Sequence, residues 1–487
     1  MSQSIFETRI KRMSGLLCIV SSLLGVAPAM AEQPRDFDYF SVNREMISRG
    51  VQAVLTCNGL FTSGRNIEQV FEQELAYLKA PVGTAYEGAY IIDEEQKRVA
   101  IIGDDAGTAI SAVFRPGIGC IVQSPPQGAD DIDSLPLNAL AASKVDTNNV
   151  SWPMGDRLDG APLPDVLDQD ALLAAADWTF DRENEEQVTI SLLVTYRGQI
   201  VLERYARGFD ENTRTRTWST AKSIAATLIG QLVDQGKLAL DAPLPVDWLP
   251  EVGNSNDDPR RAVTLRHVLN MSSGLDPADS FGREYATGSG LAYWAGASSA
   301  DGARARGLVR TPGTHWDYEN YDTLLAVLAM KGVLGDDYAE FPYRELLHRI
   351  GMRNTLLSTD RFGDFILSSQ VYTNARDLAR FGQLYLQDGV WEGERLISSD
   401  WIEFVRTPAP STANRGNFYG GQFWLVPDDR TDVPKDAYAT AGTRGQYVVI
   451  VPSHDLVIVR RGLDFGQQWF DRWDLTREVL KAFKTDE

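Results

Sequence analysis

Two strand hairpins at opposite ends of the C-terminal region constrain the fold of this chain more than any other feature. Residues 188–205, VTISLLVTYRGQIVLERY, are largely apolar around an Arg197-Gly198 turn, and residues 446–462, QYVVIVPSHDLVIVRRG, form a second hairpin pattern. The segment between them and the closing residues 472–483 have helical patterns. Strands from both ends of one segment indicate a single antiparallel sheet, with the intervening helices against one side. We therefore predict an α+β fold in which an active cleft lies between an antiparallel sheet and an all-helical lobe.

The first 31 residues have the pattern of a secretory signal. Basic residues at positions 9, 11 and 12 precede an apolar run over residues 16–26, and AMA at 29–31 is a small-x-small cleavage site. The run is too short to span a bilayer comfortably, which disfavours a membrane anchor. We expect cleavage after Ala31, a periplasmic or secreted protein, and no stable membrane anchor once the signal is removed.

Changes of composition divide the rest of the chain into three parts. Residues 32–122 form a small α+β extension, residues 123–164 form a connector rich in Pro, Asp and Asn, and residues 165–487 form the main domain. Within the extension we expect an amphipathic stretch at 66–78, two strands around a charged turn at 89–102, and another strand at 109–122.

The cysteines indicate the redox environment of the protein, and its net charge indicates which partners it can bind. Removal of the signal takes Cys18 with it and leaves Cys57 and Cys120, an even pair that favours one disulfide in an exported protein over two buried thiols. The chain has 67 acidic and 47 basic side chains, a formal net charge of -20. A negative chain repels phosphate backbones and anionic lipid, so we expect no nucleic-acid partner.

Residues 218–238, WSTAKSIAATLIGQLVDQGKL, have the pattern of a helix with a lysine, Lys222, on its apolar face. Positions three apart share a helix face, so the Ser219 hydroxyl and the Lys222 amine are within reach of each other. Lys222 lies on the apolar stripe of this helix, whereas a lysine retained for solubility belongs on the polar stripe. The alternative is an N-cap serine followed by a snorkelling lysine. The polar stripe consists of Thr220, Ser223, Thr227, Gln231 and Asp234.

This pair has the chemistry of an activated nucleophile. A serine at a helix N-terminus lies at the positive end of the helix dipole, and its own N–H is suited to bind a carbonyl oxygen. The Ser219 hydroxyl needs a partner that takes its proton. Desolvation disfavours the charged form of Lys222 and makes a neutral amine available near pH 7. The chain has no Gly-x-Ser-x-Gly elbow, and its four histidines are not required.

Five segments, in order, carry a family resemblance over residues 180–487. They are TWSTAKS with LVDQGKLALDAPL, VTLRHVLNMSSGL, TPGTHWDYEN, ARDLARFGQLYLQDGVW, and AGTRGQYVVIVPSHDLVIV. Together they resemble the serine β-lactamase and penicillin-binding superfamily, in its class C-like branch, and most of all the 6-aminohexanoate-dimer hydrolases and related serine hydrolases. The resemblance implies the β-lactamase/transpeptidase-like fold predicted above and a Ser219 acyl-enzyme.

The same resemblance assigns roles to a second motif. Tyr318-Glu319-Asn320 matches the family's Tyr-x-Asn, in which the tyrosine shares protons with Lys222 and passes one to the leaving group. Asn320 would hold Lys222 or a substrate amide through its side-chain oxygen. A rival match is Tyr372-Thr373-Asn374. We prefer Tyr318 because a Pro-Gly turn precedes it and a helix follows it.

At the third motif the sequence departs from the family. β-Lactam-binding members carry Lys or His, then Thr or Ser, then Gly on the strand lining the cleft, and this chain has Thr440-Ala441-Gly442 there. The usual clamp on a substrate carboxylate is therefore missing, which counts against β-lactamase or cell-wall carboxypeptidase activity. The resemblance still implies that the Thr443 N–H, beside Gly442, is the second oxyanion donor. Arg444 either replaces the lost charge or, as we prefer, is a solvated turn residue.

The sequence thus predicts an exported serine hydrolase, an amidase or esterase, acting on a small-molecule or peptide-like substrate. Ser219 attacks the carbonyl, Lys222 and Tyr318 form a base-and-acid pair, and no metal or organic cofactor is required. Two alternatives remain: a non-catalytic module that binds a peptide or envelope fragment, and a true β-lactamase or DD-peptidase that uses Arg444 as its anion clamp. We interpret the aromatic residues Trp218, Tyr419 and Trp424 as core.

Overall fold

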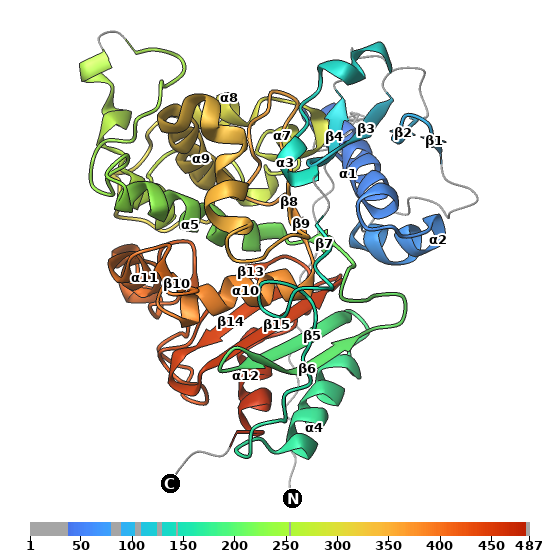
Figure 1. The fold of residues 1–487 in the computed structure, drawn as a ribbon. Coiled ribbons are helices and arrows are strands. Elements are labelled where there is room, and N and C mark those ends of the chain that lie inside the picture. Colours follow the sequence, from blue (N-terminus) through green and yellow to red (C-terminus); the bar gives the residue numbers. More distant parts are fainter. Residues whose placement is uncertain are drawn as a thin grey trace, which may run out of the picture. The chain divides into compact units, whose positions relative to one another are not determined.

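A six-stranded antiparallel sheet forms the base of the main domain in a computed structural model that describes residues 38–78, 89–102, 109–123, 129–142, 145–252 and 255–483 (Figure 1). The strand order is β12-β13-β14-β15-β5-β6. Both predicted hairpins are present, and β15 pairs with β5, so the two ends of the domain close one sheet as predicted. The strands are β5 (Thr189–Tyr196), β6 (Gln199–Tyr205), β12 (Trp424–Leu425), β13 (Tyr438–Gly442), β14 (Gln446–Val451) and β15 (Leu456–Gly462).

Helices cover both faces of this sheet because its strands are apolar on both sides. In β15, Val457 and Val459 face the core that contains α10 (Ala375–Leu386), while Leu456 and Ile458 face a second core. The second core is closed by α4 (Gln169–Phe180) and α12 (Arg472–Leu480), which pack against each other and the sheet. The predicted closing helix is therefore confirmed. Successive side chains of a strand point to opposite faces of the sheet, so alternate residues of the same strand pack into the two cores.

A helical region lies beyond α10, above the sheet as drawn in Figure 1. Its central helix is α5 (Ala221–Asp234), which packs against α9 and is buried on all sides from Ala221 to Leu232. The polar stripe of α5 is buried as far as Gln231, and only Asp234 at its end is exposed. The other helices of this region are α6 (Leu265–Leu269), α7 (Gly290–Ala295), α8 (Ser299–Arg304), α9 (Asn320–Leu334) and α11 (Ser399–Arg406).

The hydroxyl groups of the polar stripe of α5 are buried because they find partners. Ser223 Oγ donates to the Gln422 carbonyl at 2.7 Å, and the Thr227 and Tyr385 hydroxyls are 2.7 Å apart. Satisfied polar groups can be buried without a large desolvation penalty. The helix that starts beside Ser219 is thus held rigidly from every side.

The N-terminal extension is built from one long helix and a four-stranded antiparallel sheet. Helix α1 (Ser41–Phe61) packs on strands β2, β3 and β4, and a disulfide joins Cys57 of α1 to Cys120 of β4, as the even cysteine pair predicts. Residues 109–122 form two strands rather than the single one expected. Pro116 and Gly117, the latter at φ +75°, lie between them and turn the chain back. The strands are β1 (Tyr90–Asp93), β2 (Arg98–Ile101), β3 (Ile110–Arg115) and β4 (Gly119–Gln123).

Helix α1 also packs closely against the helical region of the main domain. Gly50 faces α7, where a Cβ on this residue would stand 1.7 Å from the Trp294 carbonyl oxygen. The extension therefore rests on the same helices that border the candidate site. Short elements complete the fold: α2 (Ile67–Gln69), α3 (Ala139–Ala142), β7 (Thr215–Arg216), β8 (Leu356–Leu357), β9 (Val371–Thr373), β10 (Val390–Trp391) and β11 (Glu394–Arg395).

The predicted signal, with its cleavage point after Ala31, lies outside the described residues. Among the residues that are described, no helix is both long enough and apolar enough to cross a bilayer. The division of the chain at residues 122 and 164 stays a prediction.

Candidate active site

Ser219 lies on a tight turn that leads into α5. The turn is a 3₁₀ segment, Trp218–Thr220, and Trp218 adopts φ +50°, a left-handed conformation that is strained for a bulky residue. The Arg216 guanidinium holds this tryptophan in place, because its carbon lies 4.0 Å from the Trp218 ring centre and 4.3 Å from that of Trp294. Ser219 itself is partly exposed, so a bound molecule can reach its hydroxyl.

Lys222 is buried beneath Ser219 and makes three hydrogen bonds. Its side chain is about 1% exposed, and Nζ donates to Ser219 Oγ at 3.2 Å, to Asn320 Oδ1 at 2.7 Å and to the Ser368 carbonyl at 2.7 Å. Burial lowers the pKa of Lys222 from 10.5 to about 7, although nearby carboxylates act in the opposite direction. At neutral pH a substantial fraction of this amine is uncharged and able to accept a proton.

Three carboxyl groups near the Lys222 amine partly offset the lowering of its pKa by burial. Asp279, Glu284 and Glu319 each raise the pKa of Lys222. Burial and the Asp279 charge raise the pKa of Glu284 to about 7 and that of Glu319 to about 8. Asp279 accepts from the Ser289 and Asn320 backbone N–H groups at 2.8 and 3.1 Å, so its position is fixed. The sequence patterns do not identify this acidic cluster.

Tyr318 lies against the same amine and the same hydroxyl. Lys222 Nζ lies 4.9 Å from the centre of the Tyr318 ring, and the Ser219 hydroxyl is near enough to the phenol to lower its pKa. Burial raises the pKa of Tyr318, so the phenol keeps its proton at neutral pH. The rival motif lies elsewhere: Tyr372 is buried in β9, and Asn374 caps α10 through a 2.8 Å bond from the Asp377 N–H.

The end of strand β13 approaches the nucleophile turn at Gly442. A Cβ at this position would lie 2.1 Å from the Thr217 carbonyl oxygen and 3.0 Å from the Ser219 nitrogen. Only glycine allows this backbone contact. Thr443 follows directly, so the predicted oxyanion donors come from two chain segments that touch.

Arg444 is neither the anion clamp nor the solvated turn residue that the sequence suggests. Its side chain is about 1% exposed, and its guanidinium donates to the carbonyls of Gln73, Glu74, Leu463 and Asp464 at 2.7 to 3.0 Å. Gln73 and Glu74 belong to the N-terminal extension. The sequence analysis misplaces Arg444 because its hydrogen-bond acceptors include carbonyls of the extension, which are distant in the sequence and close only in the folded chain. Arg444 ties the extension to the strand end beside Ser219.

An aromatic wall packs around Tyr318. Ring centres lie 5.7 Å apart for Tyr318 and Trp424, 6.2 Å for Tyr318 and Tyr419, and 6.0 Å for Tyr318 and Trp316. Trp316 and Trp424 are only half-buried. The interpretation of Trp424 purely as core is therefore too narrow, because it also borders the candidate site. The density of aromatic residues in NFYGGQFWLV is the signal in the sequence that points to this wall.

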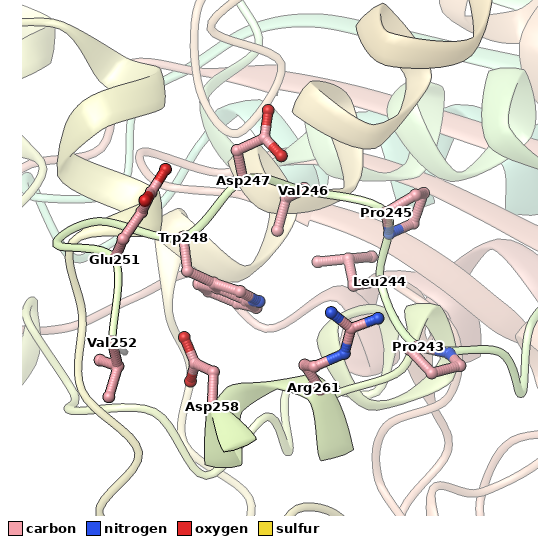
Figure 2. A pocket seen from close by; sticks show the side chains of 10 residues that line it. All are labelled: Pro243, Leu244, Pro245, Val246, Asp247, Trp248, Glu251, Val252, Asp258 and Arg261. Atoms are coloured by element: carbon pink, nitrogen blue, oxygen red, sulfur yellow. The ribbon is translucent and has the colours of Figure 1, made fainter. Parts of the chain in front are cut away.

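A separate cavity of about 870 Å³ is lined by residues that come after α5 in the sequence. Figure 2 shows residues of the Pro243–Trp248 segment on one side of it and Asp258 and Arg261 on the other. None of the residues around Ser219 lines this cavity, so it is distinct from the candidate site. In the part of the chain that the structure describes, no group of three His, Cys, Asp or Glu side chains is arranged to hold a metal.

A partly exposed serine at a helix start, 3.2 Å from the buried amine of a lysine, is the arrangement expected of a serine hydrolase that uses a Ser/Lys pair. Comparison with known proteins gives the particular family. Residues 179–472, more than half of the chain, match the β-lactamase family, and the protein belongs to that family.

Individual relatives of the chain include hydrolases. The chain is 26% identical over 350 residues to the 6-aminohexanoate-dimer hydrolase of Paenarthrobacter ureafaciens, a match covering 68% of this chain and 86% of the relative. It is 34% identical over 125 residues to esterase EstB of Burkholderia gladioli, covering 23% and 32% of the two chains. A penicillin-binding protein homologue from Caulobacter crescentus has the same fold, with a TM-score of 0.50, 16% identity, and coverage of 66% and 97%.

Proposed function

We propose that this protein hydrolyses an amide or ester bond through an acyl-enzyme on Ser219. The single observation that carries the proposal is the 3.2 Å hydrogen bond between Lys222 Nζ and Ser219 Oγ, made by an amine whose pKa falls to about 7. A base with a pKa near the working pH is the most effective proton acceptor.

In the acylation step the Ser219 oxygen attacks the substrate carbonyl while its proton moves to neutral Lys222. The backbone N–H groups of Ser219 and Thr443 stabilise the oxyanion of the tetrahedral intermediate. Tyr318, which holds its proton at neutral pH, donates it to the departing amine or alcohol and recovers a proton from the Lys222 ammonium. The carbon–leaving-group bond breaks, and Lys222 returns to its neutral form.

In the deacylation step water takes the place of the leaving group. The same base-and-acid pair removes a proton from the water as the water attacks the acyl carbon. The bond from that carbon to the Ser219 oxygen then breaks, and the pair returns the proton to this oxygen, which releases the acid and free Ser219. Because Lys222 and Tyr318 both contact Ser219, they titrate as a coupled pair. Their pKa values shift in opposite directions, and this difference supports Lys222 as the base and Tyr318 as the acid.

We also propose that the protein acts in the periplasm or outside the cell. The signal pattern of residues 1–31 and the disulfide between Cys57 and Cys120 support this location, because disulfides persist in oxidising compartments. The relatives named above, a 6-aminohexanoate-dimer hydrolase and an esterase, support a small amide or ester substrate.

Two alternatives have specific observations in their favour. The departure at Thr440-Ala441-Gly442 removes a family side-chain clamp and keeps open a binding module without turnover. Membership of the β-lactamase family keeps open a true β-lactamase or DD-peptidase. The engagement of the Arg444 guanidinium with four backbone carbonyls counts against its use as the anion clamp of such an enzyme.

One experiment separates the three functions. The mature protein is incubated with a fluorophosphonate probe, a p-nitrophenyl ester and a chromogenic cephalosporin, beside Ser219→Ala, Lys222→Ala and Lys237→Ala. Lys237 is exposed just beyond the far end of the same helix and is the matched control. We expect labelling and ester turnover in the wild type and in Lys237→Ala, and a loss of at least about a thousandfold in the other two variants. Absence of labelling would favour the binding module, and prompt cephalosporin turnover would favour the β-lactamase.

A further inference from the structure

The turn between strands β13 and β14 has an unfavourable backbone conformation next to a proposed oxyanion donor. Gly442 and Gln446 pair across this hairpin, so Thr443, Arg444 and Gly445 form its turn. Arg444 has φ +64°, in the left-handed region that residues with a Cβ rarely adopt. Such a conformation persists only where the surrounding structure holds it. Because Thr443 directly precedes Arg444, the contacts that fix Arg444 also limit the movement of Thr443.

The side chain of Arg444 joins this turn to two distant parts of the chain. Two of its carbonyl acceptors, at Leu463 and Asp464, directly follow β15 of the same sheet. The other two are the carbonyls of Glu74 and Gln73 in the extension, at 2.9 and 2.7 Å. Both extension residues lie at the end of a helical turn, where an arginine side chain can bind the last carbonyls.

The contact with the extension is buried and includes an ion pair. Glu74 Oε2 lies 3.8 Å from Arg444 Nη1, and Glu74 Oε1 lies 3.9 Å from Arg65 Nε. All three residues are buried, so salt in the solvent screens these charges little. The extension therefore holds the guanidinium of Arg444 by both hydrogen bonds and charge.

The extension is also fixed to the helical region of the main domain. The Asn43 side chain donates to the Ala286 carbonyl at 2.9 Å, and the Arg44 guanidinium donates to the Gly282 carbonyl at 3.2 Å. Both acceptors lie shortly before α7, against which helix α1 packs. The extension thus contacts the helical region and the turn after β13, the two parts of the domain that supply the proposed oxyanion donors.

We propose that the N-terminal extension positions the oxyanion hole of this enzyme through its contact with Arg444. The proposal rests on the hydrolase function proposed above, in which the N–H groups of Ser219 and Thr443 stabilise the oxyanion. Donors that are aligned before the reaction stabilise the transition state most, because no reorganisation is needed when the charge develops. Arg444 is then a positioning residue. If its contacts served the fold alone, their loss would lower Tm and leave kcat unchanged.

The first test replaces Arg444 by lysine, which keeps the charge but offers one nitrogen to four carbonyls. We expect kcat for a p-nitrophenyl ester to fall about tenfold to a hundredfold while KM changes by less than about threefold, because an oxyanion donor acts mainly in the transition state. Arg380→Lys is the matched control. Arg380 is equally buried and also donates to distant carbonyls, at Pro153 and Gly155, but its partners lie outside the candidate site. This control should lower Tm and keep kcat within about threefold of the wild type.

A transition-state analogue separates positioning from stability. When the Ser219 oxygen attacks the carbonyl carbon of an alkyl trifluoromethyl ketone, Lys222 takes the serine proton and the ketone oxygen becomes an oxyanion in the oxyanion hole. The inhibition constant should rise in Arg444→Lys by about the factor lost in kcat, and it should stay at the wild-type value in Arg380→Lys. Circular dichroism at 25 °C checks that both variants are folded. A folded Arg444→Lys protein with wild-type kcat and inhibition would overturn the proposal.

A double-mutant cycle tests the contribution of the extension itself. Glu74→Gln removes the charge that faces Arg444 and keeps the size of the side chain. Glu72→Gln, the same change at an exposed position of the same helical turn, is the control. We expect Glu74→Gln to lower kcat about threefold to tenfold and to add little to the loss in Arg444→Lys, whereas Glu72→Gln should be neutral.

Two results of this cycle would contradict the proposal. Losses that multiply in the double variant, or equal activity of Glu74→Gln and Glu72→Gln, would show that Arg444 acts without the extension. Fluorophosphonate labelling of Ser219 in the wild type would still leave the hydrolase function standing. If the wild type is neither labelled nor active, the hydrolase function fails and this inference fails with it.

Discussion

The side-chain oxygen of Asn320 lies 2.7 Å from Lys222 Nζ, and the amide nitrogen of the same side chain donates to Ser289 Oγ at 3.0 Å. The first bond fixes which end of the amide faces the lysine, because the Lys222 ammonium only donates and needs the amide oxygen as acceptor, which leaves the NH₂ group to donate to Ser289. Asn320 thus holds the amine without adding a charge next to it. Because Asn320 is neutral, it does not raise the pKa of Lys222 as a carboxylate in the same place would.

Replacement of Asn320 by aspartate should therefore make the enzyme dependent on higher pH. A carboxylate 2.7 Å from Nζ favours the ammonium form and raises the pKa of Lys222. We expect kcat/KM of Asn320→Asp to fall about tenfold to a hundredfold at pH 7 and to recover toward the wild-type value by about pH 9. A loss that is equal at every pH would show instead that Asn320 acts through the substrate.

The wild-type pH profile should have a limb that rises through about pH 7. Only neutral Lys222 accepts the Ser219 proton, so kcat/KM increases as the amine loses its charge. Glu284 raises the pKa of Lys222, and Glu284→Gln should move the limb to lower pH. The exposed Glu403→Gln variant, which alters only a surface pair with Arg406, is the control. A limb that stays in place in Glu284→Gln would contradict the assignment to Lys222.

Burial of Lys222 should leave a signature in stability as well. Because its pKa falls from 10.5 in the unfolded chain to about 7 in the native state, the unfolded state holds one more proton between these pH values. Wild-type stability should then rise by about 1.4 kcal/mol per pH unit relative to Lys222→Met over this interval. Urea denaturation of both proteins at pH 7, 8 and 9 measures the difference. Parallel pH dependence of the two proteins is the contrary result.

Addition of one methyl group at Gly442 should separate strand β13 from the nucleophile turn. The new Cβ would lie 2.1 Å from the Thr217 carbonyl oxygen, so the backbone must shift. A displacement of about 1 Å at a catalytic centre costs about a hundredfold in rate, and we expect at least that loss of kcat in Gly442→Ala. Gly307→Ala, where nothing lies within 4 Å of the added atom, should keep full activity. Normal turnover by Gly442→Ala would refute the contact.

The disulfide should stabilise the extension rather than take part in the chemistry. Cys57 and Cys120 are 63 residues apart, and closing a loop of that length contributes about 4 kcal/mol in the chain-entropy description. We expect Cys57→Ser/Cys120→Ser to lower Tm clearly while kcat at 25 °C changes little. Calorimetry with and without a reductant provides the comparison, and the reduced wild type should match the variant. An unchanged Tm would show that packing of α1 alone holds the extension.

Local sequence was sufficient for features that depend on neighbours a few residues apart. The Arg197-Gly198 hairpin, the helix from Arg472 and the contact between Ser219 and Lys222 all follow from periodicities of two and 3.6 residues. Pro116 and Gly117 are turn residues in the sequence, but the apolar run on both sides of them predicts one strand over residues 109–122 where the structure has two.

Tertiary structure alone decided which distant groups meet. Arg444 and Arg472 are both cations near the candidate site, yet the buried Arg444 donates to carbonyls that include two from the extension, whereas the half-buried Arg472 lies among aromatic rings. The acidic cluster around Lys222 and the burial of the polar stripe on α5 arise in the same way. The physical reason is range: backbone periodicity determines which face a side chain occupies, whereas its charge state and its partners depend on segments that packing brings together from far along the chain.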